Sequence, residues 1–482
     1  MSNRPETNKQ SCPVYKKCGG CQLQNLSYPE QLEFKQKKVE KLLKRFCTVE
    51  KIIGMKTPYH YRNKVQAAFY TDKKGKIISG VYQSGSHHVV GIDSCQTEDV
   101  IADKIIVAVR KLLPSFRMTT YNEDTGKGFL RHILVKRGFA TNQIMLVLVT
   151  GTPVFPSKNN FVKAILKQFP EITTIVQNIN PYRTNLVLGD NQKVLYGKGY
   201  IEDILCGCRF RISPKSFYQI NPVQTEVLYG KAIEFANLKG NETVLDTYCG
   251  IGTIGIIAAK NGAGNVIGAE LNGDAVRDAI VNARANNLKN IRFYKADAGE
   301  FMREVADEDE KPDVVFMDPP RAGSDRKFLD SLTKMSPKKV VYVSCNPETL
   351  ARDLAYLTQN SPYKAQKIQP VDMFPHTAHI ETVVLLSKGE VDSKKIRVEF
   401  SLEDMDMSEF QDGATYTQIK DYVLEHSGLK VSNLYISQIK RKCGIEVGKN
   451  YNLPKSEDSR QPQCPPEKEK AIREAMKYFG MI

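Results

Sequence analysis

The sequence predicts an α/β protein in which a doubly wound, Rossmann-like domain is joined to a β-rich domain and a small helical C-terminal extension. Three observations support this prediction. An apolar run over residues 243–247 leads into a glycine turn, Gly250 to Gly255, and then into an apolar helix. About twenty residues later a second strand, 266–270, ends in an acid, as in folds that bind adenosine-containing cofactors. Two more apolar strands, 313–317 and 340–343, read as further members of a buried parallel sheet.

Length and charge limit the possible functions. The chain has 482 residues, enough for two or three domains, and 41% of them are hydrophobic, which suffices for ordinary cores. Its formal net charge of +15 indicates an anionic partner, because lysine and arginine neutralise phosphates, although a merely basic surface is the alternative. No apolar run is long enough for a membrane helix, and the polar start has no signal-peptide core. We therefore expect a cytoplasmic monomer with no membrane partner.

Three cysteines follow a polar tail, residues 1–11, that we expect to be disordered. Cys12, Cys18 and Cys21 lie within ten residues, and two glycines before the third allow the loop to curl around an ion or cluster. Zinc sites usually take two separated ligand pairs, and only one Cys-x2-Cys pair is present. The fourth ligand must come from a distant segment, with Cys95 the best candidate and Cys47 the second. Thiolates alone, irregularly spaced, suit an iron–sulfur cluster at least as well as zinc.

The region 12–212 combines this cysteine loop with the β-rich domain. Residues 28–46 show a helical pattern, with a proline in the first turn and an apolar stripe, and we expect this helix to pack on the catalytic domain. From residue 56 onward, short strands alternate with turns. The strands are expected at 62–69, 131–137, 144–149 and 174–178.

The doubly wound domain is expected to span residues 213–388. The stretch 213–222, Ser-Pro-Lys-Ser-Phe-Tyr-Gln-Ile-Asn-Pro, opens it and precedes a helix at 223–236. The strand 340–343 is followed by Ser-Cys-Asn-Pro, which puts Cys345 on the ligand edge of the sheet. A lone cysteine is more often a small buried hydrophobe, but this sheet also carries a cofactor turn and a later acid, Glu381.

These motifs, with Asp-Pro-Pro-Arg at 318–321, resemble the RNA uracil-C5 methyltransferase family over residues 12 to about 388. The resemblance implies S-adenosylmethionine as cofactor, Cys345 as the nucleophile that adds to uracil C6, and Glu381 as the base. His376 and His379 are alternative bases, and Cys249 is a poorer nucleophile candidate. Cofactor contacts are expected from Gln219, Tyr248, Thr253, Glu270, Asp297 and Asp318.

The cysteines favour one branch of the family. The branch that acts on 23S ribosomal RNA carries a [4Fe-4S] cluster on such a pattern, so the resemblance implies that Cys12, Cys18, Cys21 and Cys95 bind this cluster. RNA contacts are expected from residues that match family motifs, namely Arg62, Lys64, Arg131 and His132. Transfer RNA is the alternative substrate. A catalytically idle, redox-sensing RNA-binding protein is the alternative of another class, but the active motifs show no damage.

The C-terminal extension, residues 389–482, lies outside this resemblance. Residues 417–426 and 432–442 are two short amphipathic patterns joined around Gly428, with Lys440, Arg441 and Lys442 on the second. A last helix is expected to end at Phe479. Two helices at this spacing resemble a helix-turn-helix, although αα-hairpins without nucleic-acid contacts share the pattern.

Overall fold

A computed structural model describes residues 12–83, 88–184, 186–307, 311–388, 416–445, 464–479 and 481–482. The predicted disordered tail, 1–11, and the predicted junction at residue 389 lie outside these residues. The chain divides into two compact units, Met1–Val391 and Asp392–Ile482. In the described part of the chain, every helix is too short or too polar to cross a membrane.

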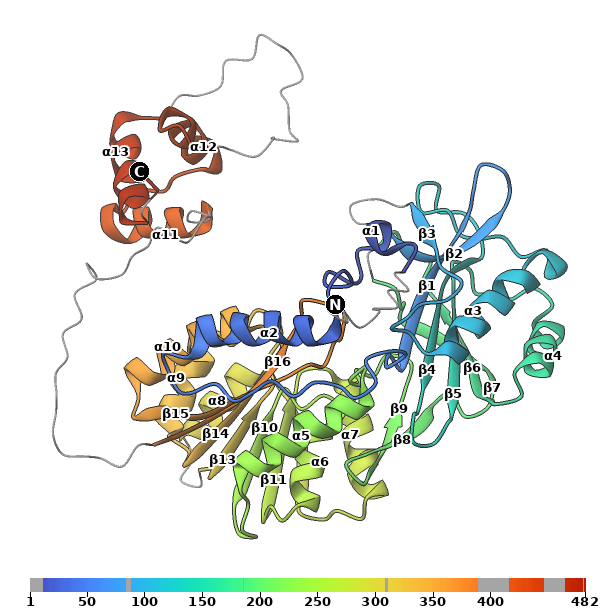
Figure 1. The fold of residues 1–482 in the computed structure, drawn as a ribbon, viewed down its shortest axis with the longest axis horizontal. Helices are drawn as coiled ribbons and strands as arrows, with labels where there is room; N and C mark the ends of the chain where they lie inside the picture. The colour runs from blue at the N-terminus through green and yellow to red at the C-terminus, as the bar shows by residue number, and fades with distance from the viewer. Residues whose placement is uncertain are drawn as a thin grey trace, which may run out of the picture. The chain divides into compact units, whose positions relative to one another are not determined.

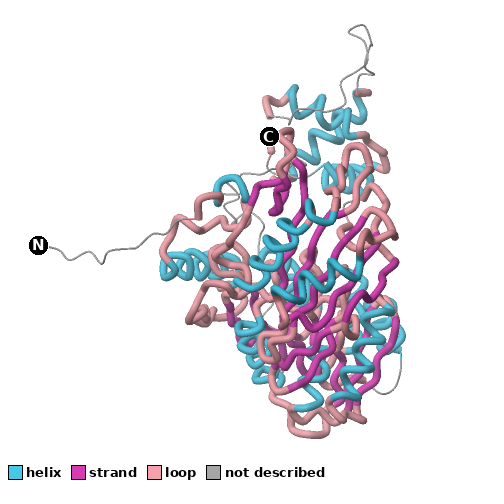
Figure 2. The backbone as a smooth tube through the Cα atoms, turned by 90° about the vertical axis from the view of Figure 1, so that its right-hand side faces the viewer, coloured by secondary structure: helices cyan, strands magenta, loops and turns pink. Residues whose placement is uncertain are grey.

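The larger unit contains a seven-stranded sheet in the order β12-β11-β10-β13-β14-β16-β15. Figure 1 labels most of these strands, and Figure 2 colours the described strands magenta. Neighbours among the first five are parallel, whereas β16 runs antiparallel to both β14 and β15. Its inner strands are apolar runs because the sheet is covered on both faces. The strands are β10 (Thr243–Thr247), β11 (Asn265–Glu270), β12 (Ile291–Lys295), β13 (Val314–Met317), β14 (Lys339–Ser344), β15 (Tyr363–Val371) and β16 (Glu381–Lys388).

Helices on the two faces of this sheet bury two separate hydrophobic cores. Residues of α5 (Pro222–Ala236), α6 (Thr253–Lys260) and α7 (Gly273–Ala285) belong to one core. Residues of α8 (Ala298–Asp307), α9 (Arg326–Met335) and α10 (Pro347–Asn360) belong to the other. The predicted doubly wound α/β fold is therefore confirmed.

Helix α2 (Tyr28–Leu43) packs beside α10 and contributes Val39 and Leu43 to the second core (Figure 1). It begins with a capping box, in which Ser27 and Glu30 satisfy each other's backbone N–H groups. The sequence pattern extends the helix to residue 46, but residues 44–46 form a turn, so the helix ends three residues earlier.

A second seven-stranded sheet, in the order β3-β2-β1-β4-β5-β6-β7, forms the β-rich region. The sequence predicted only strands there, and two helices correct that expectation. Strands β5 and β6 pair in parallel, which requires a crossover, and α4 (Lys158–Gln168) provides it. Asp99 caps α3 (Val100–Leu112) by accepting from two backbone N–H groups. The strands are β1 (Lys64–Thr71), β2 (Ile77–Tyr82), β3 (Val89–Gly91), β4 (Leu130–Arg137), β5 (Ile144–Thr150), β6 (Ile172–Ile179) and β7 (Asn191–Tyr196), with a separate hairpin of β8 (Ile201–Leu205) and β9 (Cys208–Ile212).

The smaller unit contains α11 (Tyr416–Ser427), α12 (Asn433–Lys442) and α13 (Pro466–Tyr478). These helices share a core of their own, built from residues such as Ile419, Ile436 and Ile472. Both predicted helices around Gly428 are present, and this glycine has a φ of 68°, a conformation that favours glycine after a helix.

Candidate active site

The side chains predicted to carry the chemistry gather at one edge of the doubly wound sheet. Tyr248, Asp318 and Cys345 each directly follow a parallel strand, and Glu270 ends β11. Strand β16 runs in the opposite direction, so its first residue, Glu381, lies at the same edge. The register pairs Ser344 with Thr382, which places Cys345 and Glu381 opposite each other on neighbouring strands.

Three acidic groups interact at this edge. Burial, and then the carboxylates of Glu381 and Asp318, raise the pKa of the Cys345 thiol to about 11, while Arg321 acts in the opposite direction. Burial and Asp318 also raise the pKa of Glu381 well above its usual range. Burial alone raises the pKa of Asp318 to about 7. A carboxylate with a raised pKa is a stronger base once it is ionised, which suits proton removal near neutral pH.

Access distinguishes the two candidate nucleophiles. Cys249 is 4% exposed. Its Sγ lies so close to Gly268 on β11 that a Cβ added at this glycine would be 3.1 Å from the sulfur. Cys345 is half-buried and stands just before α10, whose cap residue is Asn346. A helix N-terminus favours a thiolate. Of these two thiols, Cys345 is therefore the one suited to attack a substrate.

The glycine turn approaches the same edge closely. Gly252 has a φ of 82° and caps α6, a conformation that L side chains rarely adopt. The N–H of Gly255 donates to the buried Asp246 carboxylate at 2.7 Å. A Cβ added at position 255 would lie 3.0 Å from the same carboxylate oxygen, so a larger residue would crowd it. The turn is thus built to bring backbone near a ligand.

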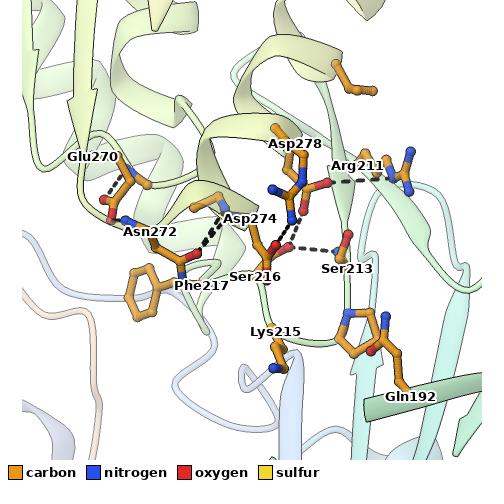
Figure 3. Close-up of a pocket in the computed structure, with 15 residues that line it drawn as sticks. Gln192, Arg211, Ser213, Lys215, Ser216, Phe217, Glu270, Asn272, Asp274 and Asp278 are labelled. Atoms are coloured by element: carbon orange, nitrogen blue, oxygen red, sulfur yellow. Dashed lines mark hydrogen bonds and ion pairs between the residues drawn. The ribbon is translucent and has the colours of Figure 1, made fainter. Parts of the chain in front are cut away.

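Glu270 is fixed beside this turn. Its carboxylate accepts from the N–H groups of Gly250 at 3.1 Å and Asn272 at 2.7 Å, which leaves lone pairs for ribose hydroxyls. A cavity of about 500 Å³ adjoins these residues and extends between α7 and the 213–217 loop (Figure 3). Phe217 lines this cavity with a ring that is 64% exposed. Cys345 and Glu381 are outside the lining, so the cavity borders the cofactor turn rather than the reactive pair.

Two predicted cofactor residues meet at a tyrosine that the sequence analysis missed. Burial raises the pKa of Tyr229, on α5, and the nearby side chains of Thr253 and Gln219 act in the opposite direction, so both lie close to its hydroxyl. Gln219 is 8% exposed, and its carbonyl accepts from Asn63 at 3.1 Å. Tyr229 thus links the opening motif of the domain to the first turn of α6.

The remaining two predicted cofactor residues have structural contacts as well. Tyr248 has a φ of 61°, and the centroid of its ring lies 5.5 Å from that of Phe328. The Asp297 carboxylate accepts from the N–H groups of Gly299 and Glu300 at the start of α8. Both bonds go to Oδ1, so the second carboxylate oxygen, Oδ2, makes neither of them.

The four predicted cluster cysteines line one small pocket. It forms between the loop around α1 (Tyr15–Cys18) and the segment that carries Cys95. Burial and the thiols of Cys95, Cys18 and Cys12 raise the pKa of Cys21, whereas Arg62 lowers it; the resulting value is about 12. Cys47 instead donates to the Gln366 carbonyl at 3.2 Å. Among the described residues, no group of three or more His, Cys, Asp or Glu has an arrangement suited to one metal ion.

Two of the expected RNA-contacting residues are buried. Arg131 is 2% exposed, pairs with Glu123 at 2.8 Å and donates to the carbonyls of Asn180 and Tyr182. His132 is 5% exposed, and burial lowers its pKa to about 4. The burial of both side chains contradicts the expectation that they face RNA, and the bonds of Arg131 are internal to the protein. Arg62 and Lys64 are half-buried.

Comparisons with known proteins agree with this site. A family model described as tRNA (Uracil-5-)-methyltransferase matches residues 183–389. The chain is 44% identical to an uncharacterized RNA methyltransferase of Bacillus cereus, over 80% of this chain and 84% of that protein. It is 46% identical to another from Listeria monocytogenes, over 78% and 83%. The crystal structure of the Pyrococcus abyssi tRNA (uracil-54, C5)-methyltransferase with S-adenosyl-L-homocysteine is 31% identical, with a TM-score of 0.65 over 76% of this chain and 85% of that one.

Proposed function

Because the chain belongs to the RNA uracil-C5 methyltransferase family, we propose that it methylates C5 of a uridine in 23S ribosomal RNA through a covalent adduct with Cys345. One observation carries the covalent mechanism. An accessible thiol, Cys345, and a buried carboxyl with a raised pKa, Glu381, lie opposite each other at the cofactor edge of the sheet.

The chemistry requires both groups. Uracil C5 is too weak a nucleophile to accept a methyl group unaided, and addition of the Cys345 thiolate to C6 converts the ring to an enolate. S-adenosylmethionine supplies a methyl group activated as a sulfonium. Glu381 then removes the C5 proton, and the electrons of that C–H bond restore the C5–C6 double bond and expel the thiolate. Burial and the two carboxylates raise the pKa of Cys345, and Arg321 acts against them, in favour of the attacking thiolate. The uridine must be flipped out, because its ring face is otherwise hidden in RNA structure.

S-adenosylmethionine binding is assigned to Gln219, Tyr248, Thr253, Glu270, Asp297 and Asp318. The fixed Glu270 carboxylate beside the glycine turn supports ribose binding. The shared contact with Tyr229 supports a common site for Gln219 and Thr253. Asp297, at the next strand end, is assigned to the adenine end.

We propose a [4Fe-4S] cluster on Cys12, Cys18, Cys21 and Cys95. Four thiols around one pocket are the donor set that such a cluster needs. One thiolate from each of the four cysteines would hold the cluster. Protein purified without oxygen should be brown and contain about four irons; colourless protein with stoichiometric zinc would contradict the assignment.

Transfer RNA is the alternative substrate. The similar structure from Pyrococcus abyssi is that of a tRNA methyltransferase, which favours this alternative. The cysteine set favours ribosomal RNA, through the resemblance to the cluster-bearing branch. Mass spectrometry of 23S ribosomal and transfer RNA from a deletion strain separates the two. Loss of 5-methyluridine from tRNA alone would overturn the ribosomal assignment.

The mechanism predicts different catalytic defects for two substitutions in the active site. Cys345→Ala should abolish methylation and leave RNA binding nearly intact. Glu381→Gln should allow addition and methyl transfer but not loss of the C5 proton, so a covalent protein–RNA adduct should accumulate. The adduct should resist denaturing electrophoresis, require S-adenosylmethionine and be absent from the double variant. Methylation by Cys345→Ala, or normal turnover by Glu381→Gln, would refute the respective role.

A further inference from the structure

The loop that leads to Glu381 is held by a distant part of the chain. Residues 372–380 connect β15 to Glu381, and three backbone groups of this loop bond to the segment that follows the cysteine pocket. Leu23 N–H donates to the His376 carbonyl at 2.9 Å, and Ala378 N–H donates to the Gln22 side chain at 3.2 Å. The N–H of His376 donates to Gln31 Oε1 at 2.8 Å.

His376 is the fixed point of this loop. Its φ of 69° is unusual for a residue with a side chain, and its ring is buried. The ring Nε2 lies 2.9 Å from the Pro58 carbonyl, which can only accept, so Nε2 carries the proton. Nδ1 must then accept, and Gln31 Nε2 donates to it at 3.2 Å. With both ring nitrogens engaged, His376 has no free nitrogen with which to act as the catalytic base.

Gln31 is the side chain that forms hydrogen bonds with both the backbone N–H and the ring of His376. It is 1% exposed on α2, accepts from the backbone of His376 and donates to its ring, and also donates to the Leu26 carbonyl at 3.0 Å. An amide offers an acceptor oxygen and a donor nitrogen side by side without a charge, as these two bonds require. Without Gln31, the buried backbone N–H of His376 and one of its ring nitrogens lose their partners, which disfavours this conformation of the loop.

We propose that Gln31 is a positioning residue for proton removal: through His376 it fixes the loop that aims Glu381 at C5 of the uracil ring. This inference rests on the proposed function of Glu381. Proton transfer depends steeply on the distance between base and proton, so a small displacement of Glu381 slows this step more than the steps before it.

The test compares Gln31→Leu with Gln36→Leu in the full-length holoenzyme. Gln36 lies on the same helix and also makes hydrogen bonds of both kinds, accepting from Ile52 N–H and donating to the Glu50 carbonyl, away from the loop. With S-adenosylmethionine and substrate RNA, Gln31→Leu should lose about tenfold or more in turnover, on the scale of losses from small misplacements. It should form the denaturation-resistant adduct as fast as the wild type and then accumulate it. Gln36→Leu should do neither.

A second variant guards against misfolding. Gln31→Glu keeps the acceptor for the His376 N–H but loses the donor to its ring, and should accumulate less adduct than Gln31→Leu. Equal loss of adduct formation and turnover in both variants would show a merely structural role and overturn the inference. If Glu381→Gln accumulates adduct and Gln31→Leu does not, the positioning role is wrong while the function stands. If Glu381→Gln itself forms none, the proposed mechanism fails first.

Discussion

Glu381 influences the titration of Cys345, because its carboxylate places a negative charge near the half-buried thiol. Glu381 is the larger of the two carboxylate contributions that raise the pKa of Cys345 to about 11. Replacing it with the neutral Gln should therefore lower that pKa. Iodoacetamide labelling of Cys345, followed against pH by peptide mass spectrometry, should shift to lower pH in Glu381→Gln.

A second cysteine in the same chain serves as the control for this experiment. Burial and Glu226 raise the pKa of Cys206 to about 12, without a contribution from Glu381. Its labelling profile should be the same in both proteins. An unchanged Cys345 profile would mean that the two groups do not interact, and would weaken the assignment of both roles.

The residues of the site differ in how far the sequence predicts them. Cys345 and Glu381 are identified because each sits in a short motif at a strand end. Gln31 leaves no such signal, because its partner His376 is 345 positions away along the chain. Tyr229 is a similar case: it reads as one apolar position of α5, and only the folded structure brings Gln219 and Thr253 to its hydroxyl. For Arg131 the error has the opposite sense. The sequence predicted that this basic residue contacts RNA, but its hydrogen-bond and ion-pair partners lie inside the protein.

At the level of elements, local patterns predict the doubly wound sheet well. Each of its inner parallel strands is an apolar run followed by a turn, so position along the chain and position in the sheet agree. The elements of the β-rich region are harder to predict from the sequence. Its helices α3 and α4 carry apolar faces that pack under a sheet, and short apolar runs of this kind do not distinguish a strand from a buried helix.

Helix α2 is attached to the catalytic domain by a buried ion pair. Lys35 Nζ lies 2.6 Å from the Asp372 carboxylate, both side chains are 0% exposed, and Lys35 also donates to the Phe374 carbonyl. Lys35→Met leaves the buried Asp372 without its cation and should destabilise the protein by about 3–5 kcal/mol. Urea unfolding monitored by circular dichroism measures this change.

A matched substitution on the same helix controls for the loss of a lysine. Lys37 pairs with Glu33 at the surface, with side chains 71% and 64% exposed, so Lys37→Met should leave the unfolding midpoint unchanged. The double variant Lys35→Met, Asp372→Asn should recover part of the loss, because it removes the unpaired charge. Wild-type stability in Lys35→Met would show that the pair does not attach the helix.

At the scale of the whole molecule, the charge is distributed unevenly. Residues 392–482 contain 15 Lys and Arg and 15 Asp and Glu, so their formal net charge is zero and the whole +15 belongs to residues 1–391. The basic end of α12 is also partly neutralised, since Lys442 pairs with Glu469 at 2.7 Å. The helix-turn-helix resemblance of this unit is thus accompanied by local basic residues but by no net positive charge.

This distribution makes a prediction about RNA binding. A protein fragment of residues 1–391 keeps the full net charge of +15 and all proposed catalytic residues. Each of the two units has its own hydrophobic core. Its affinity for substrate RNA should fall with salt at the same logarithmic slope as that of the full chain, because the slope counts the phosphates neutralised. Filter binding across a salt series measures both slopes. A shallower slope for the fragment would mean that the C-terminal unit contacts phosphates directly, and would restore its helix-turn-helix interpretation.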